Sequence, residues 1–213
     1  MRNGENTARK LRHSGMQFQT KANSEFCVGE ENWLYEILRP MRVADEVAEW
    51  LKEKGIRHAF GIVGGGNVCL FDAIAKRGFT QVVCTHHEQA AAMAATYYWR
   101  TCGRIAPVLV TTGAGSSNAI TGVLAAWMDA IPILCISGNE ASQSIQAGTR
   151  IKGVQGYHSA QAGSAFCKRG FIADNVPDAL PRLYLAYQIA TTPRYGPVWY
   201  DLPKDIANAP YLG

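Results

Sequence analysis

From Gly55 onward, short apolar runs alternate with amphipathic segments of helical length, which leaves very few fold classes open. Parallel strands that are covered by helices on both faces read as continuous apolar runs, and they alternate with helices along the chain. The sequence therefore predicts an α/β fold: a doubly wound, mostly parallel sheet with helices on both faces. Six strands are expected, at His58–Val63, Gln81–Thr85, Ala106–Thr112, Pro132–Ser137, Gly170–Ala173 and Pro197–Asp201.

Helices are expected between these strands, at Val68–Lys76, Gln89–Thr101, Ser117–Trp127 and Pro177–Thr191. Asn175 can cap the last of them, and Pro177 suits its first turn. An earlier helix is expected to begin near Met41 and to stop at Gly55, because four apolar side chains there share one helical face. These are Val43, Val47, Trp50 and Leu51.

The chain is expected to hold one main domain, at residues 41–207, with an N-terminal extension at 1–40 and a C-terminal tail at 208–213. The extension shows little periodicity. Gly138–Cys167 is richer in Gly, Ser and Gln than its flanks, and it is predicted to be a long loop with a short helix around Ser159–Phe166.

Composition excludes several classes of protein. The 213 residues are 47% hydrophobic, which is enough for one α/β core, and the net charge of +4 comes without any Lys/Arg run longer than two, so no nucleic-acid partner is indicated. No apolar stretch approaches the roughly 20 residues of a membrane span. The six cysteines form no C-x-x-C pair and are expected to be reduced thiols in a cytoplasmic protein.

Ligands of doubly wound sheets bind beyond the carboxyl ends of the strands. The loops expected to line that rim are Gly64–Asn67, His86–Gln89, Gly113–Asn118 and Gly138–Gln143. Two of them are glycine clusters that permit close approach of the backbone to a ligand. Neither matches the dinucleotide-binding pattern G-x-G-x-x-G, since Asn118 stands at the third glycine of the second cluster.

Glu88 stands where an apolar strand changes into an alanine-rich helix. On spacing alone, such a carboxylate is either a functional group at the rim or a charge that the helix dipole favours at its start. His86 and His87 do not suggest a metal site, because adjacent side chains point apart and no third ligand is at hand. The sequence also lacks a phosphate-binding loop, a nucleophile elbow and a zinc helix.

Taken in order, five blocks resemble the N-terminal pyrimidine-binding domain of the acetolactate synthase-like thiamine diphosphate enzymes. They are Phe60–Gly66, His87–Ala91, Thr112–Gly122, Trp127–Pro132 with Ser137-Gly138, and Gly196–Val198 with Asp201–Asp205. The resemblance covers Met41 to Ala207. It implies that Glu88 hydrogen-bonds the pyrimidine ring of the cofactor and drives the tautomerisation that lets the cofactor activate itself.

The resemblance also implies roles for other rim residues. Gly64, Gly65 and Gly66 would face the reacting carbon, and Gly113 and Asn118 would lie beside the pyrimidine, although Asn118 is open to a second interpretation as a helix cap. His86 is either a proton-transfer group or a structural imidazole. Gln155 is either a substrate contact or a solvated loop residue.

Members of the family need a second domain with a G-D-G motif, which holds Mg²⁺ and the diphosphate. No Gly-Asp-Gly occurs here, and the resemblance assigns no metal ligand to this chain. The expected partner is therefore a subunit that carries the diphosphate-binding domain, and a split subunit is favoured over a truncated chain. Self-association and a small 2-oxo acid substrate are expected, while FAD binding stays open. The rival hypotheses are a non-catalytic regulatory or scaffolding homologue and, less favoured, a nicotinamide enzyme.

Overall fold

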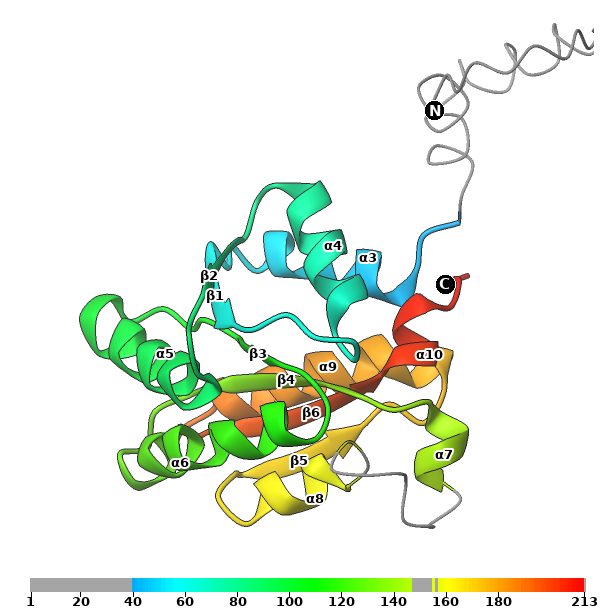
Figure 1. The fold of residues 1–213 in the computed structure, drawn as a ribbon. Helices are drawn as coiled ribbons and strands as arrows, with labels where there is room; N and C mark the ends of the chain where they lie inside the picture. The colour runs from blue at the N-terminus through cyan, green and yellow to red at the C-terminus, as the bar shows by residue number, and fades with distance from the viewer. Residues whose placement is uncertain (1–39, 147–154, 156, 213) are drawn as a thin grey trace, which may run out of the picture. The chain divides into compact units, whose positions relative to one another are not determined.

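A computed structural model describes residues 40–146, 155 and 157–212 (Figure 1). Six strands form one sheet in the order β2-β1-β3-β4-β6-β5, and every neighbouring pair is parallel. The strands are β1 (His58–Gly61), β2 (Gln81–Cys84), β3 (Val108–Val110), β4 (Leu134–Asn139), β5 (Arg169–Ile172) and β6 (Val198–Pro203). The predicted doubly wound α/β fold is confirmed, and each strand boundary lies within two residues of its prediction.

Helices cover both faces of the sheet. One face carries α3 (Val43–Glu53), α4 (Val68–Arg77), α9 (Val176–Thr191) and α10 (Lys204–Asn208). The other carries α5 (Glu88–Cys102), α6 (Ala114–Met128) and α8 (Ser159–Ser164). The short helix α7 (Ser142–Gln146) follows β4. The sequence did not predict α7 and α10, which have five residues each and are too short to show a helical period.

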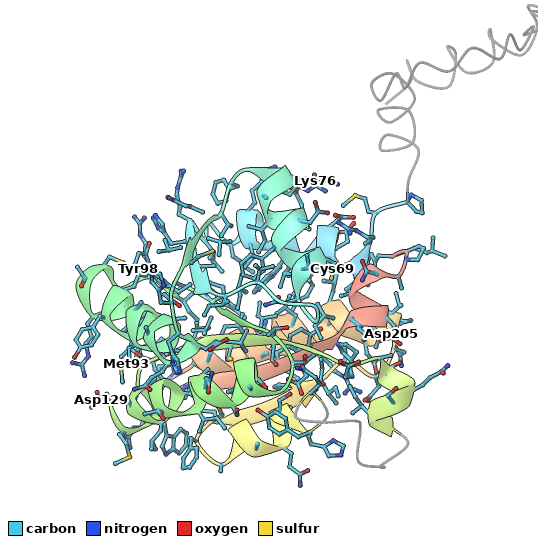
Figure 2. The ribbon with its side chains drawn as sticks, viewed as in Figure 1. Cys69, Lys76, Met93, Tyr98, Asp129 and Asp205 are labelled. Atoms are coloured by element: carbon cyan, nitrogen blue, oxygen red, sulfur yellow. The ribbon has the colours of Figure 1, made fainter. Side chains whose placement is uncertain are left out.

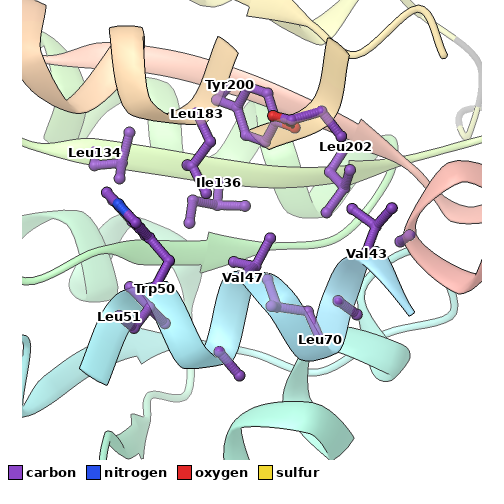
Figure 3. Close-up of a cluster of buried hydrophobic side chains, with 14 of the residues drawn as sticks. Val43, Val47, Trp50, Leu51, Leu70, Leu134, Ile136, Leu183, Tyr200 and Leu202 are labelled. Atoms are coloured by element: carbon purple, nitrogen blue, oxygen red, sulfur yellow. Dashed lines mark hydrogen bonds between the residues drawn. The ribbon is translucent and has the colours of Figure 1, made fainter. Parts of the chain in front are cut away.

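Alternate residues of the central strands supply the two halves of the core. Leu134 and Ile136 of β4 face the α3 and α9 side, whereas Cys135 between them faces α5 and α6. Figure 3 shows the first half, with side chains of α3 and α4 opposite those of the sheet and α9. Because both faces of each central strand are buried, these strands read as unbroken apolar runs.

The ends of two helices follow from local chemistry. Arg42 donates two hydrogen bonds from its guanidinium to Asp45 in the first turn of α3, and Gly55 ends that segment with a φ of 67°. The four apolar residues predicted for one face of α3 are all buried. Asn175 caps α9 by accepting from the amide of Asp178 at 2.9 Å, as predicted, and Pro177 lies in the first turn.

Two rim predictions need correction. Helix α6 begins at Ala114 rather than Ser117, so most of the expected loop Gly113–Asn118 is the first turns of a helix. Gly113, with a φ of 63°, makes the sharp turn into it. Small residues with weak helix propensity hid this start, which packing against α5 stabilises. Likewise, Gly138 and Asn139 belong to β4 and not to a loop.

The two ends of the described part of the chain meet beside α3. The amide of Val43 donates to Ala209 O at 3.0 Å, and the amide of Tyr211 donates to Met41 O at 2.7 Å. The expected extension, apart from Pro40, lies outside the described residues, so the domain boundaries stay predictions. In the described part of the chain, no helix is long and apolar enough to cross a membrane.

Candidate functional site

The topology creates a switch point between β1 and β3. The chain passes from β1 through α4 to β2 on one side, and then through α5 to β3 on the other side of β1. The segments that leave β1 and β3 therefore lead to opposite faces of the sheet, and ligands of doubly wound sheets bind beyond the carboxyl ends of the strands at such a point. The glycine-rich segments predicted from the sequence lie here, since Gly64–Gly66 follow β1 and Gly113 follows β3.

The loop after β1 is fixed by its own hydrogen bonds and by β3. Asn67 accepts from the amide of Gly64 at 2.7 Å and donates to Ile62 O at 3.1 Å. The amide of Gly66 donates to Thr111 Oγ1 at 3.1 Å. These hydrogen bonds hold the backbone of the loop in place.

The three predicted glycines have different surroundings. A β-carbon at Gly64 would lie 2.6 Å from Thr111 Cγ2, and one at Gly66 would lie 2.5 Å from Thr112 Cγ2. These two glycines are required by the packing of the loop on the end of β3. A β-carbon at Gly65 would meet nothing within 4 Å, so Gly65 is the one of the three beside open space.

Glu88 is the first residue of α5, and its side chain turns toward α6. His87 caps the helix, with Nδ1 accepting from the amide of Gln89 at 3.2 Å. Glu88 is only 8% exposed, and its Oε2 accepts from Asn118 Nδ2 at 3.0 Å. Asn118 lies inside α6, whose N-cap is Gly113, so the interpretation of Asn118 as a helix cap is wrong. The two helices bring both predicted residues into contact.

The second carboxylate oxygen of Glu88 faces a glycine. Its Oε1 lies 3.2 Å from the place that a β-carbon at Gly115 would occupy, and the same β-carbon would lie 2.6 Å from Thr111 Cγ2. Among the hydrogen bonds between described residues, Glu88 accepts on Oε2 alone from another side chain. One oxygen is therefore hydrogen-bonded by the protein, while the other faces Gly115.

Gln155 and Tyr157 reach the same region from the segment before α8. Thr112 Oγ1 donates to Gln155 Oε1 at 2.5 Å, although the rest of the Gln155 side chain is exposed. The hydroxyl groups of Tyr157 and Ser116 are 2.7 Å apart. Burial raises the pKa of Tyr157, which keeps its phenol neutral.

The structure places His86 on the surface, next to the capping residue His87. Its role in proton transfer stays a prediction. Within the described residues, no three His, Cys, Asp or Glu side chains gather closely enough to hold a metal ion. The five cysteines in the same residues are all free, and three of them are buried.

Sequence reasoning gave Thr111 and Tyr157 no place in the site. Gly115 and Ser116 lie in the segment predicted to line the rim, and Thr112 begins a block that resembles the family, but no individual role was predicted for these three residues. The two threonines end an apolar strand directly before a glycine-rich turn, and that polar ending could have drawn attention to them. No local pattern marks Tyr157, because its contact with Ser116 joins residues 41 positions apart.

Comparison with known proteins gives a consistent result. Residues 41–163 match the family model described as thiamine pyrophosphate enzyme, N-terminal TPP binding domain. The chain is 35% identical over 171 residues to the acetolactate synthase large subunit of Haemophilus influenzae, a match that covers 80% of this chain and 29% of that protein.

Two further relatives are also acetolactate synthase large subunits. The acetolactate synthase large subunit of Buchnera aphidicola subsp. Schizaphis graminum is 38% identical over 169 residues, covering 76% of this chain and 28% of the relative. The acetolactate synthase isozyme 3 large subunit of Escherichia coli is 35% identical over 171 residues, a match that covers 78% of this chain and 28% of that protein. The chain thus spans less than a third of the length of these relatives.

Proposed function

Because this chain belongs to the thiamine pyrophosphate enzymes and matches their N-terminal cofactor-binding domain, we propose that it binds the pyrimidine ring of thiamine diphosphate through Glu88. The ring would be part of an active site for decarboxylation or carboligation of a small 2-oxo acid such as pyruvate. The observation that supports this most directly is the pair of differently placed oxygens on Glu88: one is bound by Asn118 and the other faces Gly115.

The residues present fit an aminopyrimidine. A ring nitrogen beside Oε1 would gain a hydrogen bond from a largely desolvated carboxyl group, and Asn118 keeps that group from rotating away. Gly115 lets Thr111 and Glu88 pack closely on the start of α6, since a β-carbon there would meet both side chains. Gly65, beside open space after β1, lies on the same rim and would allow close approach of the reacting part of the cofactor.

When bound, thiamine diphosphate would supply the nucleophilic carbon for chemistry at the carbonyl group of the substrate. The contribution of this chain is to orient the pyrimidine and to exchange one proton with it at Glu88. We further propose that Gln155 contacts the substrate, because Thr112 engages its Oε1 and leaves its amide donors for another acceptor. His86, exposed beside the capping histidine, is proposed as a secondary proton-transfer group.

In this family the diphosphate and Mg²⁺ are held by a second domain with a G-D-G motif, and no Gly-Asp-Gly occurs among these 213 residues. We propose that a diphosphate-binding domain, on a partner subunit or elsewhere in a longer chain, docks on the rim and completes the site. Val63 and Val68 support this, because they flank the glycine loop and are 50% and 52% exposed. Apolar side chains beside a polar site are typical of a surface that a second protein covers.

The test is the substitution Glu88→Gln in the assembly purified from the native cell. We expect turnover of the 2-oxo acid to fall at least about a hundredfold, the scale of a lost general acid–base group, while assembly persists. Glu53→Gln is the matched control, since Glu53 is exposed at the far end of α3 and its substitution should leave turnover unchanged. Undiminished turnover in Glu88→Gln would refute the proposal.

The rival is a non-catalytic homologue that regulates or supports a complete enzyme by docking on it. Such a homologue would use the same docking surface at the rim, but its function would not depend on Glu88. Purification of the native assembly, followed by assays for its protein components and for bound thiamine diphosphate and Mg²⁺, separates the two. A site already complete in the partner, with turnover independent of this chain, favours the rival.

A further inference from the structure

A second buried carboxylate lies outside the Glu88 cluster. Asp201 is on β6 and is 0% exposed. Its Oδ2 accepts from the hydroxyl of Ser159 at 2.7 Å, from the amide of Ala160 at 2.9 Å and from Asn139 Nδ2 at 3.0 Å. Its Oδ1 accepts from the indole of Trp199 at 2.9 Å. Four donors thus converge on one carboxylate from three separate parts of the chain.

No ion pair between described residues involves Asp201, so these hydrogen bonds alone compensate its charge. Burial raises the pKa of Asp201, and the four hydrogen bonds act in the opposite direction. Breaking one of these hydrogen bonds would leave part of the buried charge of Asp201 uncompensated. The carboxylate therefore holds its four donors firmly in place.

The segment that Asp201 binds leads directly to the rim. Ser159 and Ala160 are the first two residues of α8, and Tyr157 comes two residues before them. Ser116 Oγ donates its single hydrogen to Gly113 O at 2.9 Å, so Tyr157 is the donor in its hydrogen bond to Ser116. Tyr157 therefore contacts the first turn of α6, which also carries Gly115.

The other rim contact of this segment is the hydrogen bond from Thr112 to Gln155. Thr112 follows β3 and packs on Gly66, while Ser116 precedes Asn118, the partner of Glu88, by two positions. The segment is thus held at one end by Asp201, and at the other it contacts Thr112 and Ser116 in the stretch that follows β3.

We propose that Asp201 is a positioning residue: by fixing Ser159 and Ala160, it holds Tyr157 and Gln155 at the rim and thereby orients the 2-oxo acid. The part of this inference that concerns the substrate rests on the proposed function. The part that concerns anchoring does not, because it follows from the hydrogen bonds of Asp201 alone.

Hydrogen exchange of the Ala160 amide tests the anchoring on the chain itself. In Asp201→Asn we expect its protection to fall at least about tenfold, as for loss of a charged hydrogen bond. Ser159→Ala keeps the carboxylate and three of its donors, so protection of the Ala160 amide should fall less in this variant. If Asp201→Asn does not fold, Ser159→Ala provides the test. Unchanged protection in both variants would overturn the inference.

Asp205→Asn is the matched control. This substitution makes the same change of charge four residues away, at Asp205 near the C-terminal end of the fold (Figure 2). Asp205 anchors α7 instead, by accepting from the amide of Ser142 at 2.9 Å and from its hydroxyl at 2.6 Å. We expect protection of the Ser142 amide to fall and that of Ala160 to stay. An equal loss at Ala160 in this control would mean that Asp201 has no specific anchoring role.

Steady-state kinetics of the complete assembly tests the functional part. We expect Asp201→Asn and Tyr157→Phe to raise the KM for pyruvate about tenfold, with kcat and the KM for thiamine diphosphate changed less than about threefold. A merely structural role would lower the amount of active enzyme and leave KM unchanged, and that result would overturn the positioning role. If the wild type shows no turnover with thiamine diphosphate, the proposed function fails, whereas the exchange experiment still decides the anchoring.

Discussion

Gly115 illustrates how a single missing side chain shapes this rim, because the space beside it is bounded by Thr111 and by Glu88 Oε1. Replacement by alanine would place a methyl group 2.6 Å from Thr111 Cγ2 and 3.2 Å from the oxygen proposed to meet the cofactor. We expect Gly115→Ala to destabilise the fold by about 1–3 kcal/mol through overpacking and to weaken cofactor binding about tenfold. Urea unfolding and thiamine diphosphate titration of the assembly measure the two effects.

A second substitution, at Thr111, separates the effect of Gly115→Ala on stability from its effect on cofactor binding. Thr111→Ser removes Cγ2, which is the closest atom, but keeps the hydroxyl that accepts from the amide of Gly66. In the double variant we expect stability to recover and cofactor affinity to stay low, because the contact with Glu88 remains. If affinity also recovers, Gly115 acts only through the packing of Thr111.

At the scale of elements, the close contact between α5 and α6 sets the geometry of Glu88 and Asn118. Gly122 lies at this contact, and a β-carbon there would stand 2.5 Å from Ala92 Cβ and 3.0 Å from Gln89 O. The hydrogen bond from Asn118 to Glu88 joins the same two helices one turn away. Any residue that separates the helices at Gly122 will therefore disturb the site.

We expect Gly122→Ala to lower the free energy of unfolding by about 1–3 kcal/mol, since a methyl group has no room between the two helices. Urea denaturation measures it. The variant Gly122→Ala with Ala92→Gly removes the contact with Ala92 Cβ but keeps the one with Gln89 O and adds a glycine to α5, so it should regain only part of the loss. An equal loss in this double variant would mean that the contact with Ala92 is not what requires glycine.

The elements differ in how far the sequence predicts them. Core strands such as β4 are predictable because burial on both faces leaves an apolar run of strand length. The start of α6 is not, because Gly113 to Ser117 are typical of a loop and only the contact with α5 makes them helical. Glu88 was predicted as the central residue, but its bond to Asn118 and the contacts of Tyr157 depend on tertiary packing, which local patterns do not contain.

For the molecule as a whole, buried thiols make the fold sensitive to alkali. Burial raises the pKa of Cys167 from 9.0 to about 12, so the folded protein keeps this proton while the unfolded chain releases it. Between pH 9.0 and about pH 12, the unfolded state therefore binds fewer protons than the folded state. The free energy of unfolding falls as pH rises through this range. Burial also raises the pKa values of Cys69, Cys135 and Tyr200, which act in the same direction.

We expect Cys167 alone to remove about 1.4 kcal/mol from the free energy of unfolding between pH 7.5 and pH 10. Urea titrations at both pH values measure the loss. Cys167→Ala lowers stability at each pH because it leaves a cavity. The difference between its free energies of unfolding at the two pH values should, however, be smaller than in the wild type by the loss predicted for Cys167. The same difference in variant and wild type would show that Cys167 does not titrate on unfolding.

The contact between Gly66 and Gly138 has a consequence for how variation in this protein should be interpreted. A β-carbon on Gly138 would overlap the carbonyl group of Gly66, and one on Gly61 would overlap the carbonyl group of Leu109. A library selected only for folding would therefore keep glycine at these positions without any demand for catalysis. Among the glycines Gly61, Gly65, Gly66 and Gly138, only Gly65 has room for a side chain, so of these four positions only Gly65 can report selection for what the rim binds.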